Sequence, residues 1–294
     1  MLKIKRMLCA LLCLILAGSV LPASAQAAIP DDAFQITVIY PEGSDVWISA
    51  GNSGSEYYAR PGETVKISLR LESALFQLDY WETEGLTLHE AQRDDWFLEF
   101  CMPEGPVTLR AVIKEADCPY TDVSRDDWFC EAVLNVSSRY LMVGTSDTTF
   151  SPHESATRAQ AAATLLGCCG GAGMGELEKL PFTDVSEDDW FYDSVYWACS
   201  SGTAAGVSDT EFAPYGVVTR AQFVTMYYKT ACLLGFAYED PLSVNFTDVP
   251  ANAYYREALG WALGNGVITG KTADTFGPND PCTRAEMAVM LLHF

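Results

Sequence analysis

Basic residues and histidine are scarce in this chain of 294 residues. Its 18 Lys and Arg stand against 39 Asp and Glu, so the formal net charge is −21. A main role in binding nucleic acid is excluded, because such proteins present a basic surface to the phosphates. The histidines His89, His153 and His293 lie far apart, and neither a His-Glu-x-x-His nor a Cys-x-x-Cys motif occurs. We therefore expect no metal site and no cofactor.

Long hydrophobic runs are also missing, except at the N-terminus. The run from Met7 to Gly18 follows three basic residues and precedes an Ala-x-Ala sequence that ends at Ala25. This pattern predicts a secretory signal peptide over residues 1–25. The run is shorter than the roughly 20 apolar residues of a membrane span, so we expect no span in the mature protein. Cleavage after Ala28 and an uncleaved anchor are the alternatives.

Cysteine is present but lacks the regular placement of a disulfide framework. Ten cysteines occur, two of them in the predicted signal peptide, and Cys168 and Cys169 are adjacent. Export would permit disulfides, yet we interpret most of these residues as small buried hydrophobes. Cys101 and Cys118 are the pair that we consider as a disulfide, although the sequence does not determine the connectivity.

The C-terminal part of the chain contains one phrase three times, as Tyr120-Thr-Asp-Val, Phe182-Thr-Asp-Val and Phe246-Thr-Asp-Val. Counted from each Asp, an aromatic residue follows after 6 residues, a glycine after 22, a phenylalanine after 28 and a Thr-Arg pair from 35. This agreement indicates three copies of one structural unit. In repeat order, the positions are Asp122, Asp184 and Asp248; Trp128, Trp190 and Tyr254; Gly144, Gly206 and Gly270; Phe150, Phe212 and Phe276; and Arg158, Arg220 and Arg284.

Each unit has the pattern of a helix, a loop and a second helix. An acidic pair such as Asp188-Asp189 opens the first helix, where carboxylates suit the helix dipole. The second helix begins at the Thr of the Thr-Arg pair. We expect the units at residues 118–170, 180–235 and 244–294, separated by short linkers. Because one helix pair cannot bury its apolar face alone, the three units should stack against each other.

The Thr-Arg phrase has two interpretations. With Gln or Glu three residues after the Thr, each copy forms a capping box that satisfies free backbone N–H groups. The box does not explain the Arg, because a cation in the first turn faces the positive end of the helix dipole at a cost of about 0.3–1 kcal/mol. Either the arginines bind an anionic ligand through their planar forks, or each forms a structural ion pair with a nearby acid.

The other repeated positions also have two interpretations each. The aromatic residues are either wedges in the core or platforms for a sugar. The aspartates either hold a turn or touch a ligand. The glycines either supply a positive φ or let a ligand approach the backbone closely.

These phrases resemble the signatures of S-layer homology domains, which are Phe-x-Asp-Val, Gly-(Val/Ile)-Ile-x-Gly and Thr-Arg-Ala-Glu. The resemblance covers roughly residues 118–294 and implies an all-α, pseudo-threefold arrangement of helix-loop-helix units. It also implies non-covalent binding to a secondary cell-wall polysaccharide on peptidoglycan, commonly through a pyruvylated amino sugar near the motif Arg. The residues that the resemblance assigns to this polysaccharide are Arg158, Arg220, Arg284, Asp122, Asp184, Asp248, Trp128, Trp190, Gly144, Gly206 and Gly270.

The three repeats are not identical. Repeat 1 has Tyr140 where repeat 3 has Gly266, and repeats 1 and 2 have Gln where repeat 3 has Glu286. We therefore expect the grooves between repeats to differ. The negative net charge does not exclude an anionic ligand, because salt screens charges beyond about 8 Å and near neighbours decide the contact. Repulsion by the whole chain should make binding sensitive to salt.

Residues 31–116 follow a different period. Val65, Ile67 and Leu69 alternate with polar residues, and turn-forming residues divide the segment, which predicts half-buried β-strands. The closing phrase from Cys101, Cys-Met-Pro-Glu-Gly-Pro-Val-Thr-Leu, resembles the last strand of bacterial surface repeats of the InlB B-repeat kind. The resemblance implies a compact β-grasp-like module. No catalytic constellation appears in this segment.

Together these patterns predict a multidomain, non-enzymatic protein that is exported to the cell wall or cell surface. The chain ends at Phe294 without a sorting motif, so we expect its attachment to be non-covalent. Three alternatives remain. The β-rich module could hold hidden enzyme chemistry, it could bind a protein partner or host surface, or the repeats could bind each other to form a lattice.

Overall fold

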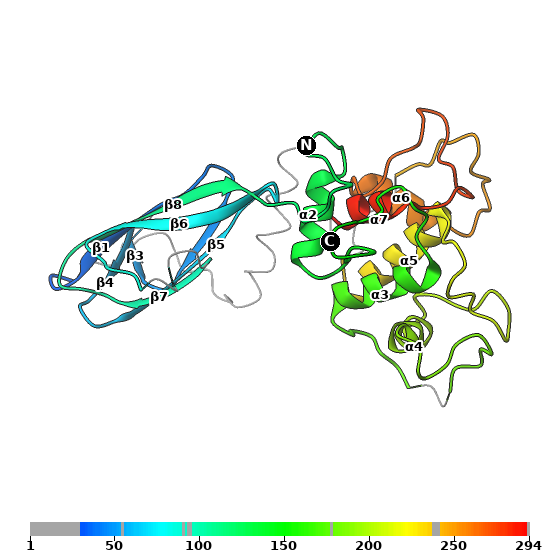
Figure 1. Cartoon of the computed structure of the whole chain (residues 1–294), viewed down its shortest axis with the longest axis horizontal. Helices are drawn as coiled ribbons and strands as arrows, with labels where there is room; N and C mark the ends of the chain where they lie inside the picture. The colour runs from blue at the N-terminus through cyan, green and yellow to red at the C-terminus, as the bar shows by residue number, and fades with distance from the viewer. Residues whose placement is uncertain are drawn as a thin grey trace, which may run out of the picture. The chain divides into compact units, whose positions relative to one another are not determined.

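The computed structural model describes residues 30–53, 56–89, 92, 96–176, 179–236 and 242–292. The predicted signal peptide over residues 1–25 lies outside the described residues. The chain divides into two compact units, one formed by residues up to 72 together with 78–113, and the other by residues 73–77 together with 114–294. Figure 1 colours the chain from one end to the other and labels its helices and strands.

The first unit is built from two β-sheets. The five-stranded sheet has the order β3-β4-β1-β8-β6, with β1 and β8 parallel and β1 and β4 antiparallel, and the second sheet has the order β2-β5-β7. Its core takes alternate residues, and on β5 these are Val65, Ile67 and Leu69. The strands are β1 Phe34–Ile39, β2 Asp45–Ile48, β3 Gly51–Ser53, β4 Glu56–Ala59, β5 Thr64–Arg70, β6 Phe76–Glu84, β7 Phe97–Cys101 and β8 Val107–Glu115.

The prediction of a β-rich module is correct, but the β-grasp comparison is wrong. A β-grasp fold packs a helix across its sheet, and the described part of residues 30–113 has strands and no α-helix. The alternation in the sequence indicates which side chains of each strand face the core of the unit. It carries no information on how the strands divide between two sheets.

The second unit holds the three repeats. Each contributes a short helix, a long loop and a second helix that begins at the motif Arg. Helix α3 packs against α4, α5 against α6, and α7 against α2, so each repeat contacts the other two (Figure 1). The helices are α2 Cys130–Ser138, α3 Arg158–Cys169, α4 Tyr192–Ser200, α5 Arg220–Leu233, α6 Arg256–Gly264 and α7 Arg284–Leu291.

The expectation that the repeat region is all-α is also wrong, because extended backbone joins the repeats. Antiparallel bridges pair Thr157 with Val217, Thr219 with Pro281, and Ser155 with Thr283. The residue before each second helix is extended, with φ −89° and ψ 161° at Thr157. The backbone groups next to it are therefore free to pair with the neighbouring repeat. The three bridges link repeats 1, 2 and 3 into a closed ring.

Candidate ligand-binding site at the junctions between repeats

The predicted capping boxes are present at all three second helices. The Thr157 hydroxyl accepts a hydrogen bond from the Gln160 N–H at 3.2 Å, and the Gln160 side chain accepts one from the Thr157 N–H at 3.0 Å. The same reciprocal pair occurs at Thr219 and at Thr283. The boxes fix the first turn of each helix and thereby position the Arg that follows the Thr.

Each motif Arg reaches into the loop of the next repeat. Arg158 donates from Nε to the Phe212 carbonyl at 2.9 Å and from Nη2 to the Ala205 carbonyl at 2.7 Å. Its guanidinium carbon lies 4.6 Å from the centre of the Phe212 ring, a favourable cation–π distance. The other two arginines repeat this geometry: Arg220 donates to Phe276 and Thr269 at 3.1 and 3.0 Å, and Arg284 to Phe150 and Val143 at 2.9 and 2.7 Å.

These contacts define three junctions, named by the repeats that they join. Arg158 forms the 1/2 junction, Arg220 the 2/3 junction and Arg284 the 3/1 junction. The arginines are only 7%, 4% and 5% exposed, respectively. Burial lowers the pKa of Arg158 and of Arg284. The guanidinium groups nevertheless stay charged at neutral pH, and hydrogen bonds to carbonyls offset their desolvation.

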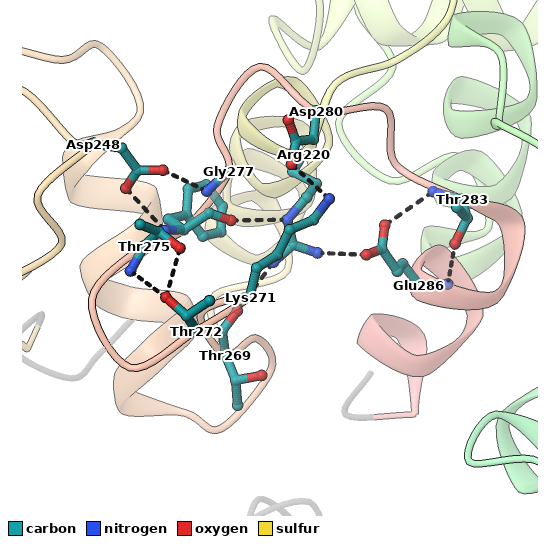
Figure 2. Close-up of polar contacts among 11 residues, drawn as sticks. Arg220, Asp248, Thr269, Lys271, Thr272, Thr275, Gly277, Asp280, Thr283 and Glu286 are labelled. Atoms are coloured by element: carbon teal, nitrogen blue, oxygen red, sulfur yellow. Dashed lines mark hydrogen bonds and ion pairs between the residues drawn. The ribbon is translucent and has the colours of Figure 1, made fainter.

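The structure bears out the ion-pair interpretation of the Arg at one junction. Arg220 forms an ion pair, because its Nη1 lies 3.1 Å from Oε1 of Glu286. Figure 2 shows this pair beside the carbonyl contacts of the same guanidinium. At the other two junctions the structure gives Nη1 of the Arg no hydrogen-bond acceptor among the described residues. All three arginines hold the ring together, and two of them keep N–H groups that a ligand could use.

The motif aspartates shape the loops that the arginines bind. Asp122 accepts hydrogen bonds from the N–H groups of Phe150 at 2.8 Å and Ser151 at 2.7 Å. Burial opposes ionisation of Asp122, but these two N–H groups outweigh it, so its pKa is lowered. The equivalent bonds run from Phe212 and Ala213 to Asp184, and from Phe276 and Gly277 to Asp248 (Figure 2). Both oxygens of each carboxylate accept hydrogen bonds from the loop backbone, so these aspartates hold the loops in place.

The repeated glycines are required because their surroundings leave no room for a side chain, and not because they adopt a positive φ. A Cβ atom on Gly144 would lie 2.4 Å from the Ser146 carbonyl oxygen, and one on Gly270 would lie 2.4 Å from that of Thr272. Gly206 is equally enclosed, and none of the three has a positive φ. They permit the tight loop that presents its carbonyls to the Arg.

The repeated aromatic residues are exposed rings and not core wedges. Trp128, Trp190 and Tyr254 are 65%, 63% and 69% exposed. Each stands edge-on against the buried aromatic residue that follows it, with ring centres 5.1–5.3 Å apart. Burial raises the pKa of the Tyr254 phenol, and the nearby charge of Arg158 acts against that rise. The phenol of a repeat 3 ring is therefore within electrostatic range of the Arg of the 1/2 junction.

Sequence reasoning missed one position that distinguishes the junctions. The residue 32 positions after the motif Asp is Glu154, Gly216 or Asp280, and its carbonyl accepts the backbone N–H of the Arg from the preceding repeat. Its fixed distance of 32 residues from the motif Asp is the sequence signal by which this position could have been recognised. Asp280 also pairs with Lys271 at 2.6 Å, as Figure 2 shows.

No group of His, Cys, Asp and Glu in the described residues could hold a metal ion. None of the described helices is both long and apolar enough to cross a membrane. The eight cysteines after the predicted signal peptide are free thiols, Cys101 and Cys118 included. Cys130 and Cys282 are buried, Cys101 and Cys232 are exposed, and the other four are half-buried, so the interpretation of most cysteines as buried hydrophobes is wrong.

The repeats match one known family. The model of the S-layer homology domain matches residues 119–162, 181–224 and 245–288. The "Surface-layer 125 kDa protein" of Lysinibacillus sphaericus is 31% identical over 164 residues, which cover 54% of this chain and 13% of that protein. The "Endoglucanase" of Bacillus sp. (strain KSM-635) is 28% identical over 180 residues, 59% of this chain and 18% of that protein.

A third relative is the "Cellulosome-anchoring protein" of Acetivibrio thermocellus, which is 26% identical over 146 residues, 48% of this chain and 32% of that protein. The chain thus spans between 13% and 32% of the length of these three relatives. The similarity of residues 31–116 to InlB B-repeats stays a prediction. The three repeats are S-layer homology domains, and the relatives of the chain include surface-layer and cell-surface proteins, which supports a location at the cell surface.

Proposed function

We propose that the three S-layer homology domains anchor this protein non-covalently to a secondary cell-wall polysaccharide attached to peptidoglycan. The observation that carries the proposal is the ring of buried guanidinium groups at the junctions, together with the exposed aromatic ring that each repeat carries. A buried cation with spare N–H groups suits a carboxylate, and an exposed ring suits the apolar face of a sugar. An acidic polymer, such as one with pyruvylated amino sugars, offers both groups.

The roles within the site follow from the contacts. Arg158 and Arg284 offer Nη1 to the acidic group, and Trp128, Trp190 and Tyr254 offer ring faces to the sugars. The aspartates and glycines named above act indirectly, by holding the loops. We further propose that the repeats extend over 118–170, 180–235 and 244–294, and that the β-rich module over 31–116 is the displayed part or spacer. We assign the chain no catalytic role, because its similarity to an endoglucanase covers only 18% of that enzyme.

Co-sedimentation with cell walls of the producing organism tests the proposal. The wild type should pellet with walls that carry the polysaccharide and stay in the supernatant with stripped walls. The double variant Trp128→Ala, Trp190→Ala should pellet less, because truncating a stacked aromatic side chain removes about 1 kcal/mol or more of binding free energy per ring. Both side chains are largely exposed, so the fold should tolerate the change.

The matched control is Trp96→Ala, which removes a 63% exposed ring from the first unit. It should pellet like the wild type. Equal pelleting of the wild type with both kinds of wall would overturn the proposal. Oligomers that grow with protein concentration in the absence of walls would instead support assembly of the repeats into a lattice.

A further inference from the structure

The three junctions differ in how far their own carboxylates neutralise the arginine. The 2/3 junction is internally paired. Nη1 of Arg220 donates to Glu286 at 3.1 Å, and Lys271 pairs with Asp280 at 2.6 Å (Figure 2). The Glu286 side chain is only 20% exposed, so it is held in place beside the guanidinium. An anionic ligand would have to displace this carboxylate.

The 3/1 junction lacks that ion pair but has another acid close by. Gln160 stands in the position of Glu286, so Nη1 of Arg284 has no acceptor among the described residues. Glu154 stands in the position of Asp280, and its carbonyl accepts the Arg284 N–H at 2.9 Å. The negative charge of Glu154 acts on this guanidinium, in addition to that of Asp122, whose counterpart Asp184 acts in the same way on Arg158. The junction therefore carries a competing acid at its edge.

The 1/2 junction has neither acid. Gln222 stands in the position of Glu286, and Gly216 in that of Glu154 and Asp280. The Gly216 carbonyl accepts the Arg158 N–H at 2.9 Å, and a Cβ on Gly216 would lie 3.7 Å from Cδ of Arg158. The glycine thus places no side chain where the other junctions carry an acidic one, and a Cβ there would lie 3.0 Å from the Ala213 carbonyl oxygen.

One carboxylate, that of Asp184, remains near Arg158, and it is already hydrogen-bonded to the loop backbone. Both oxygens of Asp184 accept backbone N–H groups, from Phe212 at 2.9 Å and from Ala213 at 2.8 Å. Arg158 is more than nine-tenths buried, yet its Nη1 has no acceptor among the described residues. Nη1 of Arg158 keeps access to solvent. In the described residues, the fully buried side-chain atom without a hydrogen-bond partner is Nε1 of Trp261 and not this nitrogen.

We infer that the 1/2 junction is the main site for the acidic group of the polysaccharide, with Arg158 as donor, and that Glu286 closes the 2/3 junction. This inference rests on the proposed function. It assigns one dominant site to a ring of three similar repeats. The reason is electrostatic, since an unpaired buried cation gains more from a carboxylate than a cation that already has one.

A single exchange of amide for acid tests the inference. Gln222→Glu places a carboxylate at the 1/2 junction, in the position that Glu286 occupies beside Arg220 at the 2/3 junction. The capping box survives, because Thr283 and Glu286 form the same box. The matched variants are Gln160→Glu at the 3/1 junction and Glu286→Gln, which opens the 2/3 junction. The probe is the acidic polysaccharide released from walls of the producing organism, titrated into each full-length variant by calorimetry, with thermal unfolding as the check on folding.

We expect Gln222→Glu to weaken binding at least about tenfold, because it removes a charge-assisted hydrogen bond to the ligand. Gln160→Glu should weaken binding by less than about threefold, and Glu286→Gln should leave it unchanged or tighter. The inference is overturned if Gln222→Glu binds as the wild type does, or if Gln160→Glu causes the larger loss. A wild type that does not bind the polymer at all would overturn the proposed function itself, which is a different result.

Discussion

Arg284 shows how far a single repeated residue could be interpreted from the sequence. The capping box and the unfavourable dipole position could be recognised from four letters, and both are present in the structure. The acceptors of Arg284 could not be recognised, because they are the carbonyls of Phe150 and Val143, 134 and 141 residues away. Every residue has a carbonyl, so no side-chain pattern marks these two. Among the described residues, the alternative of an ion pair was correct at Arg220, where Glu286 supplies the acid.

The same scale gives a prediction for the loop aspartates. Asp122→Asn should lower the free energy of unfolding by about 1 kcal/mol at pH 7, because one of two N–H groups loses its acceptor in a partly solvated site. The lowered pKa of Asp122 means that the carboxylate stabilises the fold above the unfolded-state pKa of about 3.9. That contribution is lost as the pH falls through the folded-state pKa. Urea denaturation between pH 2 and 7 measures it.

The control for this series is Asp147→Asn, an exposed aspartate in the loop that Asp122 holds. Its denaturation curves should follow those of the wild type at every pH. The gap between Asp122→Asn and the wild type should narrow as the solution becomes more acidic. A gap that stays constant down to pH 2 would mean that the carboxylate charge has no part in holding the loop.

The starts of the second helices could be predicted from the sequence, whereas the left-handed residue that ends the first helix of repeat 1 could not. Tyr140, Gly202 and Gly266 occupy the same position, and all three adopt a positive φ of 55°, 75° and 68°. The sequence difference at this position was visible, but its meaning was not. The structure shows that repeat 1 places a tyrosine in a left-handed conformation, which favours glycine.

Tyr140→Gly should therefore raise the free energy of unfolding by about 1 kcal/mol, since it relieves left-handed strain. The tyrosine side chain is 85% exposed, so little packing is lost. Gly266→Ala is the reciprocal variant, and it should destabilise the protein by a similar amount. A Cβ on Gly266 meets nothing within 4 Å, so the effect would come from the backbone alone. Thermal unfolding compares the two, and a lower melting temperature for Tyr140→Gly would contradict the explanation.

For the whole molecule, the repeats and the β-rich module could be predicted, but the way in which the repeats join could not. Hydrophobic periodicity indicates the helices and strands within a repeat. The contacts between repeats produce no periodic pattern in the sequence. The bridges at Thr157, Thr219 and Thr283 connect residues that are distant in sequence and unremarkable in type. An all-α stack was therefore the natural expectation, and the extended backbone beside each helix start corrects it.

The closed ring predicts that damage at one junction spreads to all three repeats. Arg284→Ala removes two hydrogen bonds and leaves the carbonyls of Phe150 and Val143 without their donor. It should lower the free energy of unfolding by about 3 kcal/mol.

The matched control is Arg139→Ala, which removes an exposed arginine at the end of α2 and should cost less than about 1 kcal/mol. Hydrogen exchange followed by mass spectrometry reads each repeat separately. In Arg284→Ala, exchange should speed up together in peptides from α2 and α3, α4 and α5, and α6 and α7, because loss of one junction weakens a single cooperative unit. Faster exchange confined to repeats 1 and 3 would show that the repeats unfold independently and that the ring adds no cooperativity.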